Sequence, residues 1–295
     1  MSMTISASMV KELRERTGSG MMECKKALVE AEGDMELAIE NMRKAGLAKA
    51  DKKSGRIAAE GIIGVQVSPD AKAVAIVDIN CETDFVAKAD DFVGFVNSVA
   101  TALLNAHIET EEQLLAMPLE GGVTVDEMRR GLISKLGENI TIRRFEKYQT
   151  PEGGTACYLH GSKIGVIVEL AVADGDLGKD IAMHIAASKP ICVSEAEVAP
   201  ELIEKEKEIF AAQAAESGKP AEIIEKMVLG RVSKFLAEVT LVGQPFIKDD
   251  KVTVGKLAAS KGNQIIRFSR FEVGEGIEKK EENFAEEVMA QVRGS

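Results

Sequence analysis

The feature that most constrains the fold is an internal repeat. Residues 137–146 read GENITIRRFE, and residues 262–272 read GNQIIRFSRFE. Each copy begins with a glycine and an asparagine, residue types that favour turns, and continues into an apolar segment that ends in Arg-Phe-Glu. Apolar strands and a helical pattern precede each copy. The sequence therefore predicts two related subdomains that both combine helices with strands, which is an α+β fold.

The first predicted subdomain spans residues 57–150. It opens with two strands over residues 61–67 and 73–79, which are rich in Val, Ile and Ala and are joined by the turn sequence Ser-Pro-Asp-Ala. Helical segments follow, and a last strand over residues 140–146 belongs to the repeat. This order predicts a hairpin whose sheet is completed by a strand distant in the sequence.

The second predicted subdomain consists of residues 151–190 and 238–273. Its hairpin is expected to use strands over residues 157–159 and 164–170, and a helix should follow from Leu177 to Ser188. The insertion between the two parts, residues 191–237, has two helical apolar patterns separated by a Ser-Gly-Lys-Pro turn. It is interpreted as a helical hairpin whose apolar edge packs either on the body of the protein or on a second copy.

Two small helical modules are expected at the ends. Residues 1–56 contain three short helical patterns that can close a three-helix core, and this module resembles the ubiquitin-associated fold, a docking module. Basic residues gather between Arg43 and Arg56, and we interpret them as a solvated helix end running into a linker. Residues 274–295 are expected to form a C-terminal helical module with an acidic surface.

A junction between a strand and a helix is the main functional candidate. The segment from Thr83 to Lys88 follows an apolar strand and precedes a helix whose apolar face includes Phe92 and Phe95. An aromatic residue displayed on such a rigid junction can anchor another protein surface. Spacing alone leaves open the alternative that Phe85 packs beneath the helix.

Three colinear blocks resemble the translation elongation factor Ts family, the nucleotide-exchange partners of the GTPase elongation factor Tu. They are residues 83–88 (TDFVAK), residues 10–28 with the sequence MMECKKAL at their end, and residues 181–190 (IAMHIAASKP). The resemblance covers nearly the whole chain. It implies a bacterial-type exchange factor that dislodges Mg²⁺ from its partner and promotes release of GDP, so that GTP can bind during translation elongation.

The same resemblance implies roles for individual residues. The segment that intrudes near the magnesium site of the partner would comprise Thr83, Asp84, Phe85 and Val86. Other partner contacts would be Lys25, Leu136, Gly137, His160 and Gly161. The segment from Gln244 to Ile247 is similar to the family in its first three residues, but residues 248–250 depart from the family's sequence, so the resemblance assigns no contact there. The resemblance also implies that the hairpin of residues 191–237 is a dimerisation arm.

Composition limits the remaining function classes. The formal net charge of −11 argues against broad binding to nucleic acid, which requires many Lys and Arg side chains. No apolar run has the length of a membrane span, and the four scattered cysteines suggest neither disulfides nor a zinc site, so we expect a reduced, cytoplasmic protein. Each of the three histidines is expected to have a structural role rather than to bind a metal.

No catalytic motif is evident in the sequence. The nucleophile-elbow, zinc-protease, dinucleotide-binding and P-loop patterns are all absent. A protein without a phosphate-binding loop can act on guanine nucleotides only through a partner that has one. We therefore expect no enzyme activity, no cofactor and no metal. Two alternatives stay open: a generic protein-binding adaptor, and an enzyme with a cleft between the two repeated subdomains.

Overall fold

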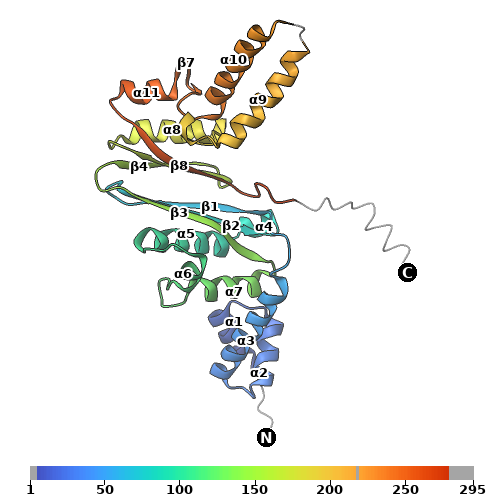
Figure 1. Ribbon diagram of the computed structural model, residues 1–295. Coiled ribbons are helices and arrows are strands. Elements are labelled where there is room, and N and C mark those ends of the chain that lie inside the picture. The colour runs from blue at the N-terminus through green and yellow to red at the C-terminus, as the bar shows by residue number, and fades with distance from the viewer. Residues whose placement is uncertain (1–4, 217–218, 279–295) are drawn as a thin grey trace, which may run out of the picture.

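The structure, a computed structural model, describes residues 5–278 except 217–218, and it confirms the α+β class (Figure 1). The helix expected near the C-terminus falls beyond the described residues. The helices are α1 (Ala7–Thr17), α2 (Met21–Glu30), α3 (Met35–Lys53), α4 (Asp84–Ala87), α5 (Asp90–Asn105), α6 (Glu111–Ala116), α7 (Val125–Leu136), α8 (Gly175–Ser188), α9 (Pro200–Ala215), α10 (Ala221–Val239) and α11 (Val254–Ser260), with one 3-10 turn, η1 (Glu195–Glu197). The strands are β1 (Glu60–Val67), β2 (Ala73–Cys81), β3 (Ile140–Gln149), β4 (Gly154–His160), β5 (Ile164–Leu170), β6 (Pro245–Phe246), β7 (Asp249–Thr253) and β8 (Ile265–Glu272).

The first sheet has the antiparallel order β1-β2-β3, as expected for a hairpin completed by a distant strand. One face is covered by α5, whose apolar side chains Phe92 and Phe95 enter the core beneath the sheet. The turn between β1 and β2 is held by the Ser68 hydroxyl, which donates to Asp70 at 2.6 Å and accepts from the Ala73 amide at 2.8 Å. Turn chemistry and apolar alternation together explain why this hairpin could be predicted.

The second sheet has the order β4-β5-β8, and α8 packs across it. The approach of α8 is close: a Cβ atom added to Gly178 would lie 2.5 Å from the Cβ atom of Ala156 on β4. Strand β4 begins at Gly154, so the expected start at residue 157 was wrong. Gly154 belongs to the strand because the chain packs closely there: a Cβ atom at this position would lie 2.6 Å from Ala173.

The two sheets pack face to face between the outer helices, which gives a layered body (Figure 1). The layer between them is apolar and contains Ile63, Ile76, Tyr148, Ile167 and Phe271, among others. At Gly165 the sheets approach so closely that a Cβ atom would lie 2.5 Å from Ile63. The alternative of an enzyme cleft between the two subdomains has no support here, because packed side chains fill this space.

The N-terminal module is a three-helix bundle with a small apolar core, in which Leu13 and Leu28 are fully buried. Its last helix, α3, continues to Lys53 and packs along α7 of the first subdomain. The interpretation of the basic stretch as a solvated helix end holds for Arg43 and Arg56, whose side chains are 61% and 53% exposed, but three of its members also contact the body. Arg43 pairs with Glu127, Lys53 donates to the Gly137 carbonyl, and Arg56 lies 3.5 Å from Glu82. These contacts fix the module on the body.

Helices α9 and α10 form an antiparallel hairpin that projects from the second subdomain (Figure 1). The two helices bury Ala214 and Val232 between them, and Arg231 lies over the ring of Phe210 at 5.9 Å. Large apolar side chains nevertheless stay exposed along the hairpin: Ile209, Ile223 and Leu229.

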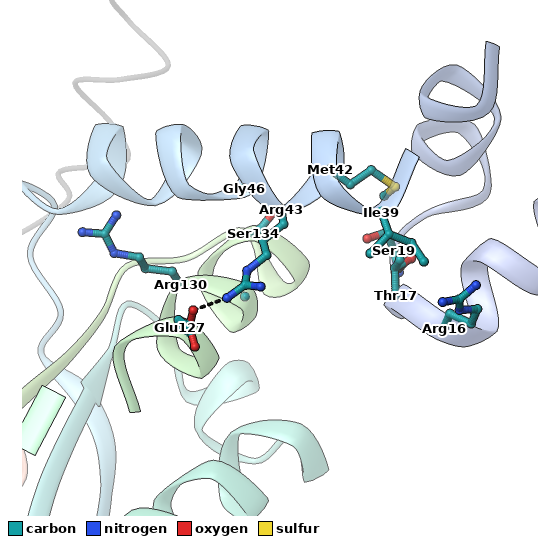
Figure 2. A pocket seen from close by; sticks show the side chains of 11 residues that line it. Arg16, Thr17, Ser19, Ile39, Met42, Arg43, Gly46, Glu127, Arg130 and Ser134 are labelled. Atoms are coloured by element: carbon teal, nitrogen blue, oxygen red, sulfur yellow. Dashed lines mark hydrogen bonds and ion pairs between the residues drawn. The ribbon is translucent and has the colours of Figure 1, made fainter. Parts of the chain in front are cut away.

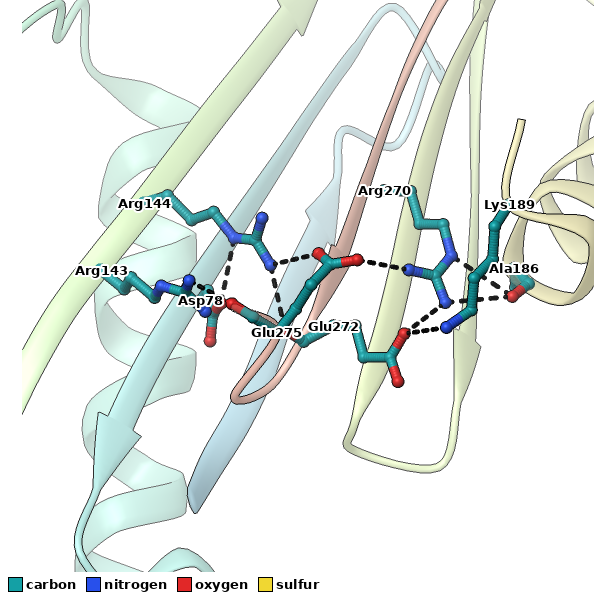
Figure 3. Close-up of polar contacts among 8 residues, drawn as sticks. All are labelled: Asp78, Arg143, Arg144, Ala186, Lys189, Arg270, Glu272 and Glu275. Atoms are coloured by element: carbon teal, nitrogen blue, oxygen red, sulfur yellow. Dashed lines mark hydrogen bonds and ion pairs between the residues drawn. The ribbon is translucent and has the colours of Figure 1, made fainter. Parts of the chain in front are cut away.

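A chain of ion pairs connects the two sheets at the end of β8 (Figure 3). Asp78 on β2 is fully buried and lies 3.1 Å from Arg144 on β3. Arg144 and Arg270 bind the two carboxylate oxygens of Glu275 at 3.3 and 3.4 Å. Burial raises the pKa of Asp78, and Arg144 opposes this change. The network attaches residues 272–275 to both sheets.

Candidate functional site at the strand–helix junction

The junction is a single helical turn, α4, that is anchored from below. The side chains of Val86 and Ala87 are buried in the core of the first subdomain. Thr83 is the N-cap, and its hydroxyl accepts a hydrogen bond from the Val86 amide at 3.4 Å. With two of its four residues buried and its first turn capped, the backbone of α4 has little freedom to move.

The side chain of Phe85 points away from this anchor. It is 82% exposed, the largest exposed fraction among the large apolar side chains of the described residues. The alternative in which Phe85 packs beneath the following helix is therefore excluded. An isolated, fully displayed aromatic ring on a fixed backbone is energetically unfavourable in water and suits a residue that is buried by another protein.

Asp84 lies beside the ring on the same turn. Its carboxylate forms an ion pair with Lys88 at 2.6 Å, and the hydrogen bond from Lys88 lowers the pKa of Asp84. The group is therefore a carboxylate at neutral pH. More distant charges, those of Glu60 and Lys163, also act on this pKa. The junction thus presents one apolar ring next to one fixed negative charge.

The turn that contains His160 and Gly161 lies at the same end of the body as the junction. Lys163 in this turn binds the Glu60 carboxylate at 2.7 Å, and Glu60 pairs in register with Cys81 at the end of β2. His160 is exposed, and its Nδ1 atom lies 3.2 Å from the Tyr158 hydroxyl. The packing of the two sheets therefore brings these separate candidates onto neighbouring surface.

Leu136 and Gly137 lie at the C-terminal end of α7, whereas Lys25 lies on α2. Leu136 packs partly buried against the first core, and Gly137 ends α7 in the left-handed conformation with φ of 82°. This φ explains the glycine independently of any partner. Lys25 is an exposed side chain on α2 of the N-terminal module, distant from α4 (Figure 1).

Gln244 has a structural role that the sequence did not reveal. It is buried, and its amide oxygen lies 2.9 Å from Nε2 of His184, whose Nδ1 accepts a hydrogen bond from the Ile247 amide at 3.2 Å. The expected structural role of His184 is confirmed by these contacts. Ile247 itself is half exposed, so the tip of this segment remains accessible.

Sequence reasoning missed the polar residues that hold the junction in place. The carboxylate of Glu138 accepts hydrogen bonds from the Glu82 and Thr83 amides at 3.1 and 2.9 Å, and from the Thr83 hydroxyl at 2.6 Å. Glu82 in turn accepts a hydrogen bond from the Asn139 amide at 2.6 Å. The adjacency of Glu138 to the recurring Gly-Asn turn was the only signal available, and it does not indicate a partner 55 residues away.

A pocket lies between the N-terminal module and α7 (Figure 2). This pocket has a volume of about 230 Å³ and is lined by residues of both parts, including Met42 and Ser134. Its arginines are already engaged: Arg16 binds Glu36 at 2.7 Å, and Arg130 binds Asp126 at 2.8 Å. The pocket therefore offers no free charge around which a ligand site could be argued.

Burial raises the pKa of the Cys81 thiol to about 12, so this sulfur is a neutral thiol rather than a nucleophile at pH 7. Within residues 5–278, leaving out 217–218, no three His, Cys, Asp or Glu side chains are arranged to hold a metal ion. Over the same part of the chain, no helix is both long enough and apolar enough to cross a bilayer.

Comparison with known proteins decides the family. A family model described as "Elongation factor TS" matches residues 82–275, which include the junction, β3 and the whole of the second sheet. The chain belongs to the elongation factor Ts family. It is similar to the elongation factor Ts of Methylococcus capsulatus, with 66% identity over 293 residues that cover 99% of this chain and 100% of that protein.

Other members of the elongation factor Ts family are nearly as similar. The protein of Thioalkalivibrio sulfidiphilus is 62% identical over 294 residues, and that of Legionella pneumophila is 55% identical over 290 residues. Both matches cover at least 98% of this chain and 99% of the relative. Membership of this bacterial family identifies the chain as a translation elongation factor.

Proposed function

We propose that this chain is the guanine nucleotide exchange factor for elongation factor Tu, and that Phe85 is the side chain it inserts into that GTPase. The observation that carries the proposal is the 82% exposure of Phe85 on a capped and anchored helical turn. A ring held in this way loses little conformational freedom when a partner buries it. Its burial is then available as binding energy, about 1.5 to 3 kcal/mol for a large apolar side chain.

The exchange activity follows from thermodynamic linkage rather than from chemistry. A factor that binds the nucleotide-free GTPase more tightly than the GDP-bound form must weaken GDP binding by the same ratio. In P-loop GTPases a Mg²⁺ ion bridges the phosphates and the protein, so a small displacement of its surroundings loosens the nucleotide. Phe85 would enter an apolar groove of the partner, and Asp84 would disturb the polar network beside the ion.

The remaining contacts are proposed at three places. Leu136 and Gly137 would support the inserted turn, and His160 and Gly161 would face another domain of the partner from the neighbouring surface. Lys25, on the separate N-terminal module, would provide a charged contact to the GTPase domain. Because the contacts lie on separate parts of the body, loss of one exposed charge such as Lys25 should weaken binding only slightly.

The test is stopped-flow release of a fluorescent GDP analogue from purified elongation factor Tu. The parent chain should accelerate release, and Phe85→Ala should reduce the stimulated rate about 10- to 100-fold, because about 1.5 to 3 kcal/mol of apolar burial is lost. Phe85→Leu should retain part of the activity. Val172→Ala, which shortens another exposed apolar side chain on a loop of the second subdomain, is the matched control and should behave like the parent.

The dependence of GDP release on Mg²⁺ distinguishes displacement of the ion by Phe85 from simple binding of the partner. If insertion of Phe85 acts by displacing the ion, the difference between the parent and Phe85→Ala should shrink when Mg²⁺ is removed with a chelator before mixing. A parent chain that binds elongation factor Tu but leaves GDP release unchanged would defeat the proposal. The chain would then be better explained as an adaptor that binds through its N-terminal module.

We also propose that the hairpin of α9 and α10 mediates self-association. Ile209, Ile223 and Leu229 remain exposed along it, and a second copy could cover them. Sedimentation should then show a dimer at micromolar concentration, which Leu229→Glu should convert to monomer. A monomeric parent under these conditions would remove this part of the proposal.

A further inference from the structure

We propose that Glu138 is a positioning residue for Phe85, and that the turn of residues 137–139 couples the orientation of this ring to the N-terminal module. This inference rests on the proposed exchange function. It concerns a residue that does not need to touch the partner, since Glu138 is partly buried against the junction. Its carboxylate accepts hydrogen bonds from residues 82 and 83, which lead directly into α4.

The Glu138 carboxylate replaces the strand partner that the junction lacks. Strand β2 ends at Cys81, so the next two amides have no partner in the sheet ladder. One carboxylate oxygen, Oε2, accepts both amides, from Glu82 at 3.1 Å and from Thr83 at 2.9 Å. Hydrogen bonds to a charged acceptor are stronger than neutral ones, so this contact fixes the direction in which the chain enters α4.

The other oxygen of Glu138 orients the cap of the helical turn. The Thr83 hydroxyl has a single proton, which it donates to Oε1 of Glu138 at 2.6 Å. Its lone pair is thereby directed toward the Val86 amide, from which it accepts at 3.4 Å. Without the Glu138 carboxylate, the Thr83 hydroxyl could rotate and lose the hydrogen bond from the Val86 amide. The position of Glu138 is thus transmitted through Thr83 to the turn that displays Phe85.

The same turn is attached to the end of α3. The side-chain amide of Asn139, which is buried, donates to the carbonyls of Ser54 at 3.3 Å and Arg56 at 2.8 Å. Lys53 donates to the carbonyl of Gly137. The last residues of the N-terminal module and the first residues of the junction therefore bind opposite sides of one three-residue turn.

A reciprocal contact closes the arrangement. The Glu82 carboxylate accepts from the Asn139 amide at 2.6 Å and lies 3.5 Å from the Arg56 guanidinium, while Glu138 binds the amide of Glu82. Each segment thus supplies a carboxylate to the backbone of the other. A displacement of the N-terminal module would require these hydrogen bonds to break or to move together with α4, which is the physical basis of the coupling.

The experiment is a double-mutant cycle in the GDP-release assay. Glu138→Gln keeps the shape of the side chain but removes its charge and one acceptor, and it should lower stimulated release about tenfold because hydrogen bonds to a charged group are lost. In the Phe85→Ala background the same change should have almost no further effect, since the ring that it positions is absent. Glu146→Gln, at an exposed position on β3, is the matched control and should leave release unchanged.

A structural readout accompanies the kinetics. In Glu138→Gln the amides of Glu82 and Thr83 should exchange hydrogen faster than in the parent, while the core of the first subdomain keeps its protection. If Glu138→Gln does not fold, Thr83→Val removes the hydroxyl that donates to Glu138, whereas Thr83→Ser keeps a hydroxyl and should retain this hydrogen bond. Both variants are measured in the same cycle.

The outcomes distinguish this inference from the proposed function. Non-additive loss with faster exchange at residues 82 and 83 supports the inference. Equal losses with and without the Phe85 ring would show that Glu138 acts on general stability, and an unchanged rate in Glu138→Gln would show that it does not act at all; either result overturns the inference while the exchange function stands. A parent chain that fails to accelerate GDP release overturns both.

Discussion

Exchanging one methyl group between α8 and β4 should test the packing of the second subdomain. In Gly178→Ala the new Cβ atom would lie 2.5 Å from the Cβ atom of Ala156, well inside an ordinary contact, and 3.4 Å from Leu170. Both Cβ atoms are attached directly to the backbone, so no rotation of a side chain can relieve the overlap. The helix or the strand must shift.

The expected magnitude follows from two opposing terms. Overpacking a filled core costs up to about 3 kcal/mol, whereas replacing glycine by alanine inside a helix stabilises it by about 1 kcal/mol. Gly178→Ala should therefore destabilise the chain by about 2 kcal/mol. Gly131→Ala, in the interior of α7 with no atom within 4 Å of the new Cβ, should stabilise it by about 1 kcal/mol. Two chemically identical changes thus differ in sign.

The double variant Gly178→Ala/Ala156→Gly moves the methyl group from one side of the contact to the other. It conserves volume, so it should lie within about 1 kcal/mol of the parent although each single change destabilises. The chain has no tryptophan, so urea unfolding is followed by far-ultraviolet circular dichroism. If Gly178→Ala proves as stabilising as Gly131→Ala, the close approach of α8 to β4 is refuted.

Three further predictions concern single positions. Burial lowers the pKa of His184, and its Nδ1 atom accepts a hydrogen bond from the Ile247 amide, so the folded protein favours the neutral ring. Because the unfolded chain binds the proton more readily, the free energy of unfolding should fall as the pH drops below about 6.5 toward the lowered pKa. Urea unfolding at pH 7.5 and 5.5 should show this loss, which His184→Leu should abolish. Ala71 has a φ of 53°, so Ala71→Gly should raise the unfolding free energy by about 1 kcal/mol, and an unchanged midpoint in urea would contradict this. Phe85→Ala should change the free energy of unfolding in urea by less than about 0.5 kcal/mol, because the ring is almost wholly exposed. A larger loss would mean that Phe85 packs within the fold.

Local patterns in the sequence predicted most of the architecture. The hairpin of β1 and β2 carries its own turn chemistry, and α5 carries an apolar face with helical spacing, so neither depends on distant contacts for its prediction. The repeat around Gly137 and Gly262 indicated the two subdomains. The start of β4 was missed because Gly153 and Gly154 are required by close packing, which a propensity argument interprets as a turn.

The candidate site was only partly predictable. A helix of one turn has no period from which the buried face can be inferred, so the sequence could not decide whether Phe85 or Val86 is exposed. The contacts of Glu138 and Asn139 join segments that are far apart in the chain, and hydrogen bonds between side chains and backbone amides or carbonyls leave no pattern in a single sequence. The same reason explains why the ion pair between Arg43 and Glu127 was missed.

The ion pairs around Glu275 determine how far the chain can be shortened. In a chain that stopped at Gly274, buried Asp78 would be the remaining carboxylate partner of Arg144. The positive charges of Arg144 and Arg270 would then repel each other, because the Glu275 carboxylate between them would be missing. A chain that stopped one residue later would retain the carboxylate that both guanidinium groups share. Residue 275 is also where the family match ends. Tags, reporters or natural extensions joined after this position should therefore leave the two-sheet body intact, whereas a cut only one residue earlier should loosen it.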